Sequence, residues 1–468
     1  MTYLFPAARP LLAPLMAALV LAGCASSPPA IDPSALPVTP TLFRESRAVA
    51  ADTAPAAPFQ AQWWKAFSDP VLDQLVTQAL RSNNSLSVAA GRLAQARAIA
   101  RRADADRSPQ LGLGAGAVRQ TDPAANNRPK TVVSVGANFS YEVDLFGKLA
   151  GASDAASLDA QSRESLLRSA QLLVQADVAQ TYLNLRALDA ERALVRDTLQ
   201  AYRNTLRLTE VRFREGDVAE LDVARVRTEV ASTESEALAL DRRRAELEHA
   251  LAVLVGEVAS SFQLPSGEWT TALPVIPAGV PSTVLVRRPD VSAAQSSMQA
   301  AQARVGVAKA AWFPVFSLTA NGGYAAPEIG DLFKMSTRAW GVGALLSLPL
   351  FDGGRREAGV NNANAELDIA LASYREQILV AFRDVEDQLS ALRLLAEQSE
   401  AQSRSVASAA RATLLSDSRY RNGFVSQLEL LDAQRSELRN RRQALQVKAS
   451  QYVATVGLIR ALGGGWNT

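Results

Sequence analysis

The chain has 468 residues, among them 49 lysines and arginines, 47 aspartates and glutamates, one cysteine and one histidine. Its formal charge of +2 provides no clustered basic surface, which argues against nucleic acid as a partner. The single thiol and the single histidine, His249, exclude an internal disulfide and a multi-cysteine metal site, and they leave most histidine-based catalysis without its parts. Hydrophobic residues make up 48% of the chain but aromatic residues only 6%, a composition that favours long helices.

The N-terminus has the pattern of an export signal. Arg9 precedes an apolar stretch over residues 11–20, which has the length of a signal-peptide core and is too short to span a bilayer. The following Leu21-Ala22-Gly23-Cys24 resembles the bacterial lipobox, in which the cysteine is acylated and begins the mature protein. We therefore expect lipidation of Cys24 and, because Ala25 rather than aspartate follows it, sorting to the outer membrane; the alternative is a plain secretory signal with an incidental cysteine.

Helix breakers divide the chain into repeating zones. Prolines occur up to Pro129 and again from Pro265 to Pro349, so residues 130–264 and 350–468 lack them. This pattern, together with the spacing of the glycines, predicts two long helical hairpins with turns at Gly216 and Gly423. The glycines of the helical parts are Gly151, Gly216 and Gly256 in the first zone and Gly359, Gly423 and Gly457 in the second.

The two turns also match in sequence. The stretch from Arg212 to Asp222 aligns without a gap with the stretch from Arg419 to Glu429, each residue 207 positions later, which indicates an internal duplication. Arms of about 65 residues would be on the order of 100 Å long and must lie against neighbours along their whole length. Their apolar stripe is broader than the seam of a two-stranded coiled coil, which favours contacts on two sides.

Each helical zone is preceded by two strand-like segments. From Thr131 to Phe146 apolar residues alternate with polar ones, and residues 111–117 form the expected partner; residues 316–321 and 340–348 repeat the pattern. Strands of about ten residues can cross a bilayer when tilted, although a soluble antiparallel sheet shows the same alternation. Four strands cannot close a barrel in lipid, so we expect other copies to supply the rest, and three copies would give twelve strands.

Several short motifs stand out by their order and spacing along the chain. They are Trp63-Trp64-Lys65-Ala66-Phe67, Asp69-Pro70, Tyr141-Glu142-Val143-Asp144-Leu145-Phe146-Gly147, Arg288-Pro289-Asp290-Val291, Pro349-Leu350-Phe351-Asp352-Gly353-Gly354 and Leu430-Leu431-Asp432-Ala433-Gln434-Arg435. Together they resemble the motifs of the outer-membrane factors of bacterial efflux systems, the TolC-like proteins, and among these the NodT-type lipoproteins of resistance-nodulation-division pumps. The family commonly has tryptophan where this chain has Tyr141.

The resemblance implies an α+β membrane protein. Its expected form is a homotrimer whose 12-stranded β-barrel, with four strands from each protomer, continues into a long periplasmic α-helical barrel with a mixed equatorial domain. The implied function is that of the outer-membrane channel of a tripartite efflux system: a passive gated conduit that exports small molecules or drugs from an inner-membrane efflux pump through a periplasmic adaptor protein. Such a conduit is not an enzyme and needs no cofactor. A component of type I protein secretion and, in a different class, a lipid-anchored coiled-coil scaffold are the alternatives.

These expectations divide the chain into eight segments. The cargo, the cognate pump and the adaptor do not follow from the sequence. The segments are a signal peptide (1–23), a lipidated N-terminal segment with equatorial helices (24–107), a first barrel hairpin (108–146), a first long helical hairpin (147–256), an equatorial linker and helix (257–311), a second barrel hairpin (312–351), a second long helical hairpin (352–457) and a C-terminal equatorial tail (458–468).

Polar residues on the strands are candidates for the barrel lumen, because a conduit needs a wet interior. Asn138, Glu142 and Asp144 are predicted to face it; the alternative for Glu142 and Asp144 is a role at the strand-to-helix junction before Gly147. Asp417 is predicted to form a negative, cation-sensitive ring with its symmetry mates at a pore constriction, with a solvated helix charge as the alternative. His249 is expected to be structural or exposed rather than a ligand.

By the resemblance, the two helical turns form the periplasmic tip, where the channel meets its adaptor. The residues implied in this contact come from corresponding positions of the two matched turns. They are Arg212, Gly216, Val218 and Leu221 in the first turn, and Arg419, Gly423, Val425 and Leu428 in the second.

Overall fold

The computed structural model describes residues 29–30, 34, 36–45, 62–121, 129–276 and 281–464. The predicted signal peptide and Cys24 lie outside the described residues. The chain forms two compact units. One, the sheet unit, contains Gly91–Glu164 and Ala293–Glu376; the other, the hairpin unit, contains Pro37–Ala90, Ser165–Ser292 and the chain from Gln377 on.

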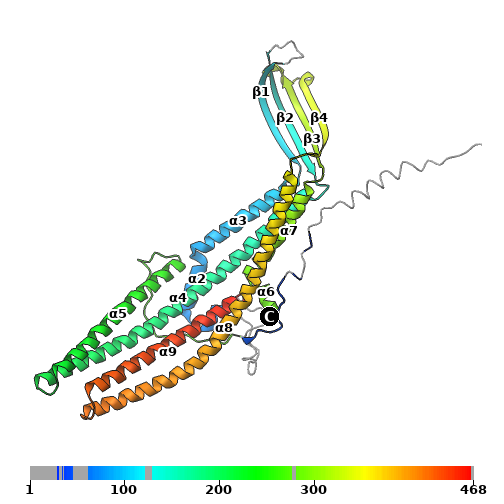
Figure 1. The fold of residues 1–468 in the computed structure, drawn as a ribbon. Coiled ribbons are helices and arrows are strands. Elements are labelled where there is room, and N and C mark those ends of the chain that lie inside the picture. Colours follow the sequence, from blue (N-terminus) through cyan, green and yellow to red (C-terminus); the bar gives the residue numbers. More distant parts are fainter. Residues whose placement is uncertain are drawn as a thin grey trace, which may run out of the picture. The chain divides into compact units, whose positions relative to one another are not determined.

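The same order of elements occurs twice along the chain (Figure 1). Each set has a 22-residue helix, two strands, a 67-residue helix and a 35-residue helix, and the long helices of the second set begin and end 207 positions after those of the first. This agreement supports the internal duplication. The first set is α3 (Asn84–Ala105), β1 (Gln110–Thr121), β2 (Pro129–Val143), α4 (Lys148–Arg214) and α5 (Glu220–Leu254); the second is α7 (Pro289–Ala310), β3 (Val315–Ala326), β4 (Arg338–Ser347), α8 (Arg355–Arg421) and α9 (Gln427–Ala461).

Shorter elements lie before each set and within the second one, and among these the 3-10 helix η6 (Met335–Thr337) directly precedes β4. The 3-10 helix η3 (Trp63–Phe67) and helix α2 (Pro70–Ser82) precede the first set, and helix α6 (Pro281–Arg287) precedes the second. The 3-10 helix η5 (Ile329–Asp331) lies between β3 and β4. None of the described helices is both long enough and apolar enough to cross a membrane.

The sheet unit contains one antiparallel sheet of four strands in the order β1-β2-β3-β4. Leu111 lies opposite Phe139, Phe139 opposite Ala320, and Ala320 opposite Val342, so one face carries most of the large apolar residues of the four strands. This confirms the alternation expected from the sequence. Strand β2 ends at Val143 rather than at Phe146, because the residues from Asp144 on turn into helix α4.

Helices at the base of the sheet are joined by polar contacts. Within the sheet unit, Ser162 of α4 and Ser297 of α7 have their hydroxyl oxygens 2.8 Å apart, and Arg97 of α3 forms an ion pair of 2.9 Å with Glu164. A second ion pair joins Arg304 of α7 to Asp159. The strands therefore continue into a small set of helices that are fixed to one another side by side.

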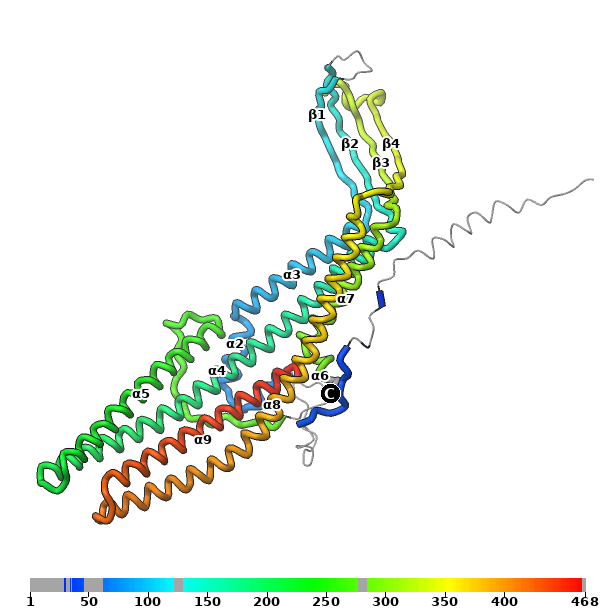
Figure 2. The backbone as a smooth tube through the Cα atoms, in the orientation of Figure 1, coloured from blue at the N-terminus to red at the C-terminus, as the bar shows by residue number. Residues whose placement is uncertain are grey.

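Both long hairpins turn at the glycine that the sequence indicates. The backbone φ angle is +82° at Gly216 and +76° at Gly423, a left-handed conformation that glycine adopts without strain. The backbone N–H of Gly216 donates to Phe213 O (3.1 Å) and that of Gly423 to Tyr420 O (3.0 Å), so the two turns share one hydrogen-bond pattern. Figure 2 follows the backbone through both turns.

The end of the second hairpin differs from the expected position. Helix α9 continues through Gly457 to Ala461, and the residue that matches Gly256 is Gly463, since both have positive φ angles, +77° and +91°. Gly457 instead permits a close contact, because a Cβ atom there would lie 2.6 Å from Oε1 of Gln388. Gly457 therefore marks a packing contact rather than a helix end.

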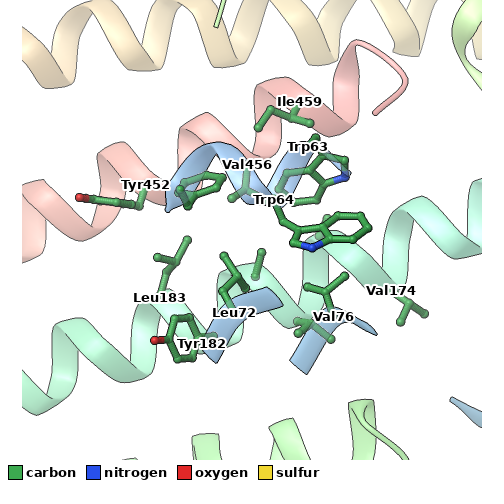
Figure 3. Close-up of a cluster of buried hydrophobic side chains, with 14 of the residues drawn as sticks. Trp63, Trp64, Leu72, Val76, Val174, Tyr182, Leu183, Tyr452, Val456 and Ile459 are labelled. Carbon is green, nitrogen blue, oxygen red and sulfur yellow. The ribbon is translucent and has the colours of Figure 1, made fainter. Parts of the chain in front are cut away.

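The core of the hairpin unit is built around η3. Trp63, Trp64 and Phe67 are buried, and Figure 3 shows the two tryptophans between Val174 of α4 and Ile459 of α9. The indole Nε1 of Trp63 donates to Gln175 Oε1 over 2.8 Å, which satisfies its buried polar group. The tryptophan motif thus holds the N-terminal segment to both hairpins.

A buried polar network accompanies this core. Asp69 caps α2 by accepting hydrogen bonds from the backbone N–H groups of Val71 and Leu72, and its Oδ2 accepts from the hydroxyl of Tyr182 over 2.8 Å. The Tyr182 hydroxyl in turn accepts from Arg186 Nε over 3.0 Å. A hydroxyl that serves two partners connects α2 to α4, so its removal leaves two charged groups without one of their bonds.

We predict opposite effects for two buried tyrosines. Tyr182→Phe should destabilise the protein by about 1–3 kcal/mol, because Asp69 and Arg186 each lose a partner. Tyr202 is equally buried, but its hydroxyl has no hydrogen-bond partner among the described residues, so Tyr202→Phe should be neutral or stabilising by about 1 kcal/mol. Denaturation followed by circular dichroism in detergent compares the two; equal losses would contradict the assignment.

The same pair predicts an alkaline pH dependence. Burial raises the pKa of Tyr202 from 10.0 to about 12, and burial likewise raises the pKa of Tyr182 to about 12. Ionisation of either group therefore has no effect on the free energy of unfolding below pH 10, and this free energy falls as the pH rises from 10 to about 12, because the unfolded chain loses the proton first. Tyr202→Phe should make the loss of stability over this interval less steep.

Candidate functional site

The second face of the sheet carries small and polar side chains. Gly112, Asn138, Asn321 and Gly341 lie opposite one another in one row across the four strands. A Cβ atom on Gly112 would lie 2.7 Å from Asn138 Oδ1, and one on Gly341 would lie 2.9 Å from Asn321 Oδ1. Each asparagine side chain therefore covers a neighbouring glycine, which gives this row a thin polar surface without charge.

The backbones of β2 and β3 approach closely at a pair of glycines. Gly136 lies opposite Gly323, and a Cβ atom on Gly323 would lie 2.2 Å from the carbonyl oxygen of Val135. A side chain at this position would displace the neighbouring strand. Gly322, one residue earlier and on the apolar face, has open space around it.

Glu142 and Asp144 lie together where β2 passes into α4. Asp144 Oδ2 accepts a hydrogen bond of 2.7 Å from the backbone N–H of Ala150, in the first turn of α4, and Glu142 pairs with Lys148 over 3.1 Å. Gly147, the residue directly before α4, has a backbone φ angle of +74°. The structure therefore gives both carboxylates the junction role that was the alternative. Asn138 is exposed on the polar face, away from this pair.

The two helical turns present apolar side chains to solvent. Val218 and Val425 are half-buried, whereas Leu221 and Leu428 are exposed, as are Gly216 and Gly423. The sequence-predicted tip residues thus occupy equivalent places in the two turns. A further apolar residue, Phe424, is also exposed at the second turn.

Arg212 links one hairpin to the other. Its Nη1 donates to the hydroxyl of Tyr420 over 3.1 Å, and its guanidinium carbon lies 5.3 Å from the centre of the tyrosine ring. Arg419, the residue that corresponds to Arg212 in the second turn, is exposed. The duplicated turns therefore differ in their contacts, and only the first arginine ties α4 to α8.

Asp417 lies one helical turn before the end of α8. Its carboxylate pairs with Arg421 over 2.8 Å, and its side chain is 34% exposed, whereas that of Arg421 is 75% exposed. An ion pair between residues four apart on a helix contributes little to stability when it is this accessible. The carboxylate of Asp417 is thus paired within its own helix and only partly exposed.

Contacts between α5 and α9 were not anticipated from the sequence. Glu229 pairs with Arg435 and Glu236 pairs with Arg442, which also reaches Glu191 of α4. The two acids of α5 and the two arginines of α9 help to line an open groove of about 340 Å³ between the hairpins. In both the Glu229–Arg435 and the Glu236–Arg442 pair the two residues are 206 positions apart, close to the repeat of 207, and this spacing is the feature of the sequence that could have indicated the contacts.

Within the described residues, no three histidine, cysteine, aspartate or glutamate side chains are placed to hold a metal ion. His249, on α5, is exposed.

Comparison with known proteins gives concordant results. The family model for "Outer membrane efflux protein" matches residues 75–257 and 280–464. The chain is 33% identical to the solvent efflux pump outer membrane protein SrpC of Pseudomonas putida, over 88% of this chain and 94% of that protein. It is 34% identical to the pyoverdine export outer membrane protein OpmQ of Pseudomonas aeruginosa, over 97% of this chain and 96% of that protein.

A solved structure extends the similarity to the fold. The outer membrane channel CmeC of Campylobacter jejuni matches with a TM-score of 0.89 and 25% identity, over 95% of this chain and 96% of that one. The duplicated set of helices and strands is thus the architecture of a known class of membrane proteins.

We predict that a side chain is tolerated at Gly322 but not at the neighbouring Gly323. Gly323→Ala should weaken the pairing of β2 with β3 and lower the stability by about 1–3 kcal/mol, because the new methyl group meets the backbone at Val135. Gly322→Ala makes the same chemical change in open space and serves as the matched control. Thermal denaturation in detergent measures both; equal midpoints for the two variants would contradict the close approach.

Proposed function

This chain belongs to the outer membrane efflux protein family, and we propose that three copies of it form the outer-membrane channel of a tripartite efflux system. In this arrangement the sheets of three copies close a 12-stranded barrel, the long helices continue the passage into the periplasm, and acylated Cys24 adds a lipid anchor. The observation that carries the proposal is the four-stranded sheet with an apolar face and a small polar face, which continues into duplicated long hairpins.

The polar face of the sheet suits a passive lumen. Most residues of this face are glycine, asparagine, serine and threonine, which are small or uncharged and leave room for water, and Glu142, paired with Lys148, adds a charge only near the junction with α4. The relatives differ in cargo, since one is named for solvents and another for pyoverdine. We therefore assign to this chain the role of a conduit whose cargo is chosen by a partner, an inner-membrane pump that acts through a periplasmic adaptor.

The adaptor contact is proposed at the helical turns. Both turns expose a leucine, Leu221 and Leu428, next to a half-buried valine, and each turns through a glycine. Short apolar side chains on a rigid turn suit packing against the end of another helical hairpin. Three copies would present six such turns of two alternating kinds.

Asp417 is proposed as the constriction residue. Three copies would bring three such carboxylates towards one axis, where like charges repel unless they are hydrated or paired. The pairing of Asp417 with Arg421 within one copy would lower this repulsion in a closed state. Breaking that pair would expose a negative ring that favours cations.

The direct test is conductance of the purified, acylated protein in planar bilayers at both membrane polarities. We expect discrete, mostly closed channels with a preference for cations. Asp417→Ala should raise the single-channel conductance and reduce the cation preference, whereas Asp217→Ala, which removes an exposed acid at the first turn, should change neither. Repeated insertion of folded protein without channels, for the wild type and for Asp417→Ala alike, would contradict the proposal.

If the adaptor binds at the helical turns, a bulky substitution there should abolish export and leave assembly of the channel intact. Gly423→Arg should abolish export in cells that depend on this channel, because a long charged side chain replaces an exposed turn surface. Gly423→Ala imposes the same backbone strain, about 1–2 kcal/mol, without the bulk, and should retain most of the export. Drug susceptibility and the oligomeric state of the purified variants are the measurements; normal export by Gly423→Arg would refute the assignment of the tip.

A further inference from the structure

The connection between β3 and β4 is an ordered apolar projection. We call residues 327–337 the knob; it contains η5 and a second 3-10 helix, η6 (Met335–Thr337). The hydroxyl of Thr337 lies 2.9 Å from the carbonyl oxygen of Leu332 and 2.8 Å from that of Lys334, and the side chain of Leu332 is buried. The knob therefore has a small interior of its own and a defined outer surface.

That outer surface consists largely of apolar side chains. Ile329 is 75% exposed, Phe333 73% and Met335 75%. Three large apolar residues held in water by a hydrogen-bonded turn are unfavourable unless they contact another apolar medium. The neighbouring charges are Glu328, Asp331 and Lys334, of which Lys334 and Asp331 pair with each other.

The knob contacts the apolar face of the sheet. The ring of Phe333 meets the ring of Tyr324 edge-on, with the ring centres 5.6 Å apart. Tyr324 lies opposite Val135 on one side and Arg338 on the other, in the row of residues that forms the apolar face. Trp340, two residues after Arg338 on the same face, is 71% exposed. The knob is thus continuous with the surface proposed to contact lipid.

Arg338 supplies a cation at the border of this surface. It is the first residue of β4, its side chain is exposed, and it has no ion-pair partner among the described residues. An arginine at the edge of an apolar surface keeps its stem in the apolar region and its guanidinium at the polar border, where it can bind a phosphate with two hydrogen bonds. Aromatic side chains favour the same border region.

We propose that the knob and Arg338 form a site for the phosphorylated headgroup of an outer-leaflet lipid. Arg338 binds the phosphate, Phe333 and Tyr324 contact the sugar that carries it, and acyl chains lie along Trp340 and Val342. The site would fix the depth and orientation of the β3–β4 end in the membrane. It rests on the barrel placement proposed above, because only that placement brings this face into lipid.

The experiment uses the full-length protein purified in dodecylmaltoside and titrated with diphosphoryl lipid A or with its phosphate-free form, with binding followed by native mass spectrometry. Arg338→Gln should lower the affinity for the phosphorylated lipid about fivefold and leave the phosphate-free lipid unaffected. Phe333→Ser should lower the affinity for both. Arg101→Gln, which removes an exposed arginine of α3, is the control and should change neither affinity.

Three outcomes would overturn the site. They are an unchanged affinity in Arg338→Gln, equally tight binding of the phosphate-free lipid by the wild type, or a change in channel conductance in the variants without a change in lipid affinity, which would assign the knob to the channel mouth. Normal oligomers and channels of the wild type, together with any of these results, would leave the proposed function intact. Failure of the wild type to form channels would instead count against the function itself.

Discussion

An open sheet edge in lipid is the constraint on which the account of this protein depends. Among the described strands, β1 and β4 each have a hydrogen-bonded neighbour on one side only, while one face of the sheet is apolar across all four strands. Every unpaired backbone group costs several kcal/mol in hydrocarbon, so a single copy cannot place this sheet in a membrane. Closure with other copies removes both edges at once, and assembly and insertion are then aspects of one process.

The internal duplication allows one chain to supply two long helical hairpins of the same length, and thus a long passage when several copies assemble. The helix lengths and the glycine turns are the same in both halves, so three copies would supply six similar hairpins. The contacts between the halves are not symmetric, because Arg212 reaches Tyr420 while Arg419 stays exposed. The copies of the repeat have thus kept their geometry and diverged in the side chains that join them.

The sequence predicted those features that depend on local rules. Proline-free zones, the positive-φ glycines Gly216 and Gly423, and the alternation along the strands each follow from the conformation of a few neighbouring residues. The resemblance to outer-membrane factors then supplied the family, which the comparison confirms. The assigned tip, lumen and constriction residues remain proposals.

Features that depend on distant residues could not be predicted in the same way. The bond between Asp69 and Tyr182 and the ion pair of Glu229 with Arg435 join segments more than a hundred residues apart. Glycine is equally ambiguous, since Gly457 has the spacing of a helix end but serves a close contact with Gln388. The contacts of Glu142 and Asp144 at the strand-to-helix junction are a similar case. The alternation along a strand predicts on which face of the sheet a residue lies, but it does not predict which residue it contacts.

The most direct measurement of the central claim is a cross-link between the two sheet edges. Val342→Cys would be combined in turn with Leu111→Cys, Leu113→Cys and Ala115→Cys, all on the apolar face of the edge strands β4 and β1, and treated with a short bifunctional thiol reagent. Within one copy these strands are three spacings, about 14 Å, apart, beyond the reach of a reagent of about 8 Å. We predict covalent trimers for at least one pair and none for the single variants. Folded protein that yields only monomers for every pair would contradict the closed barrel.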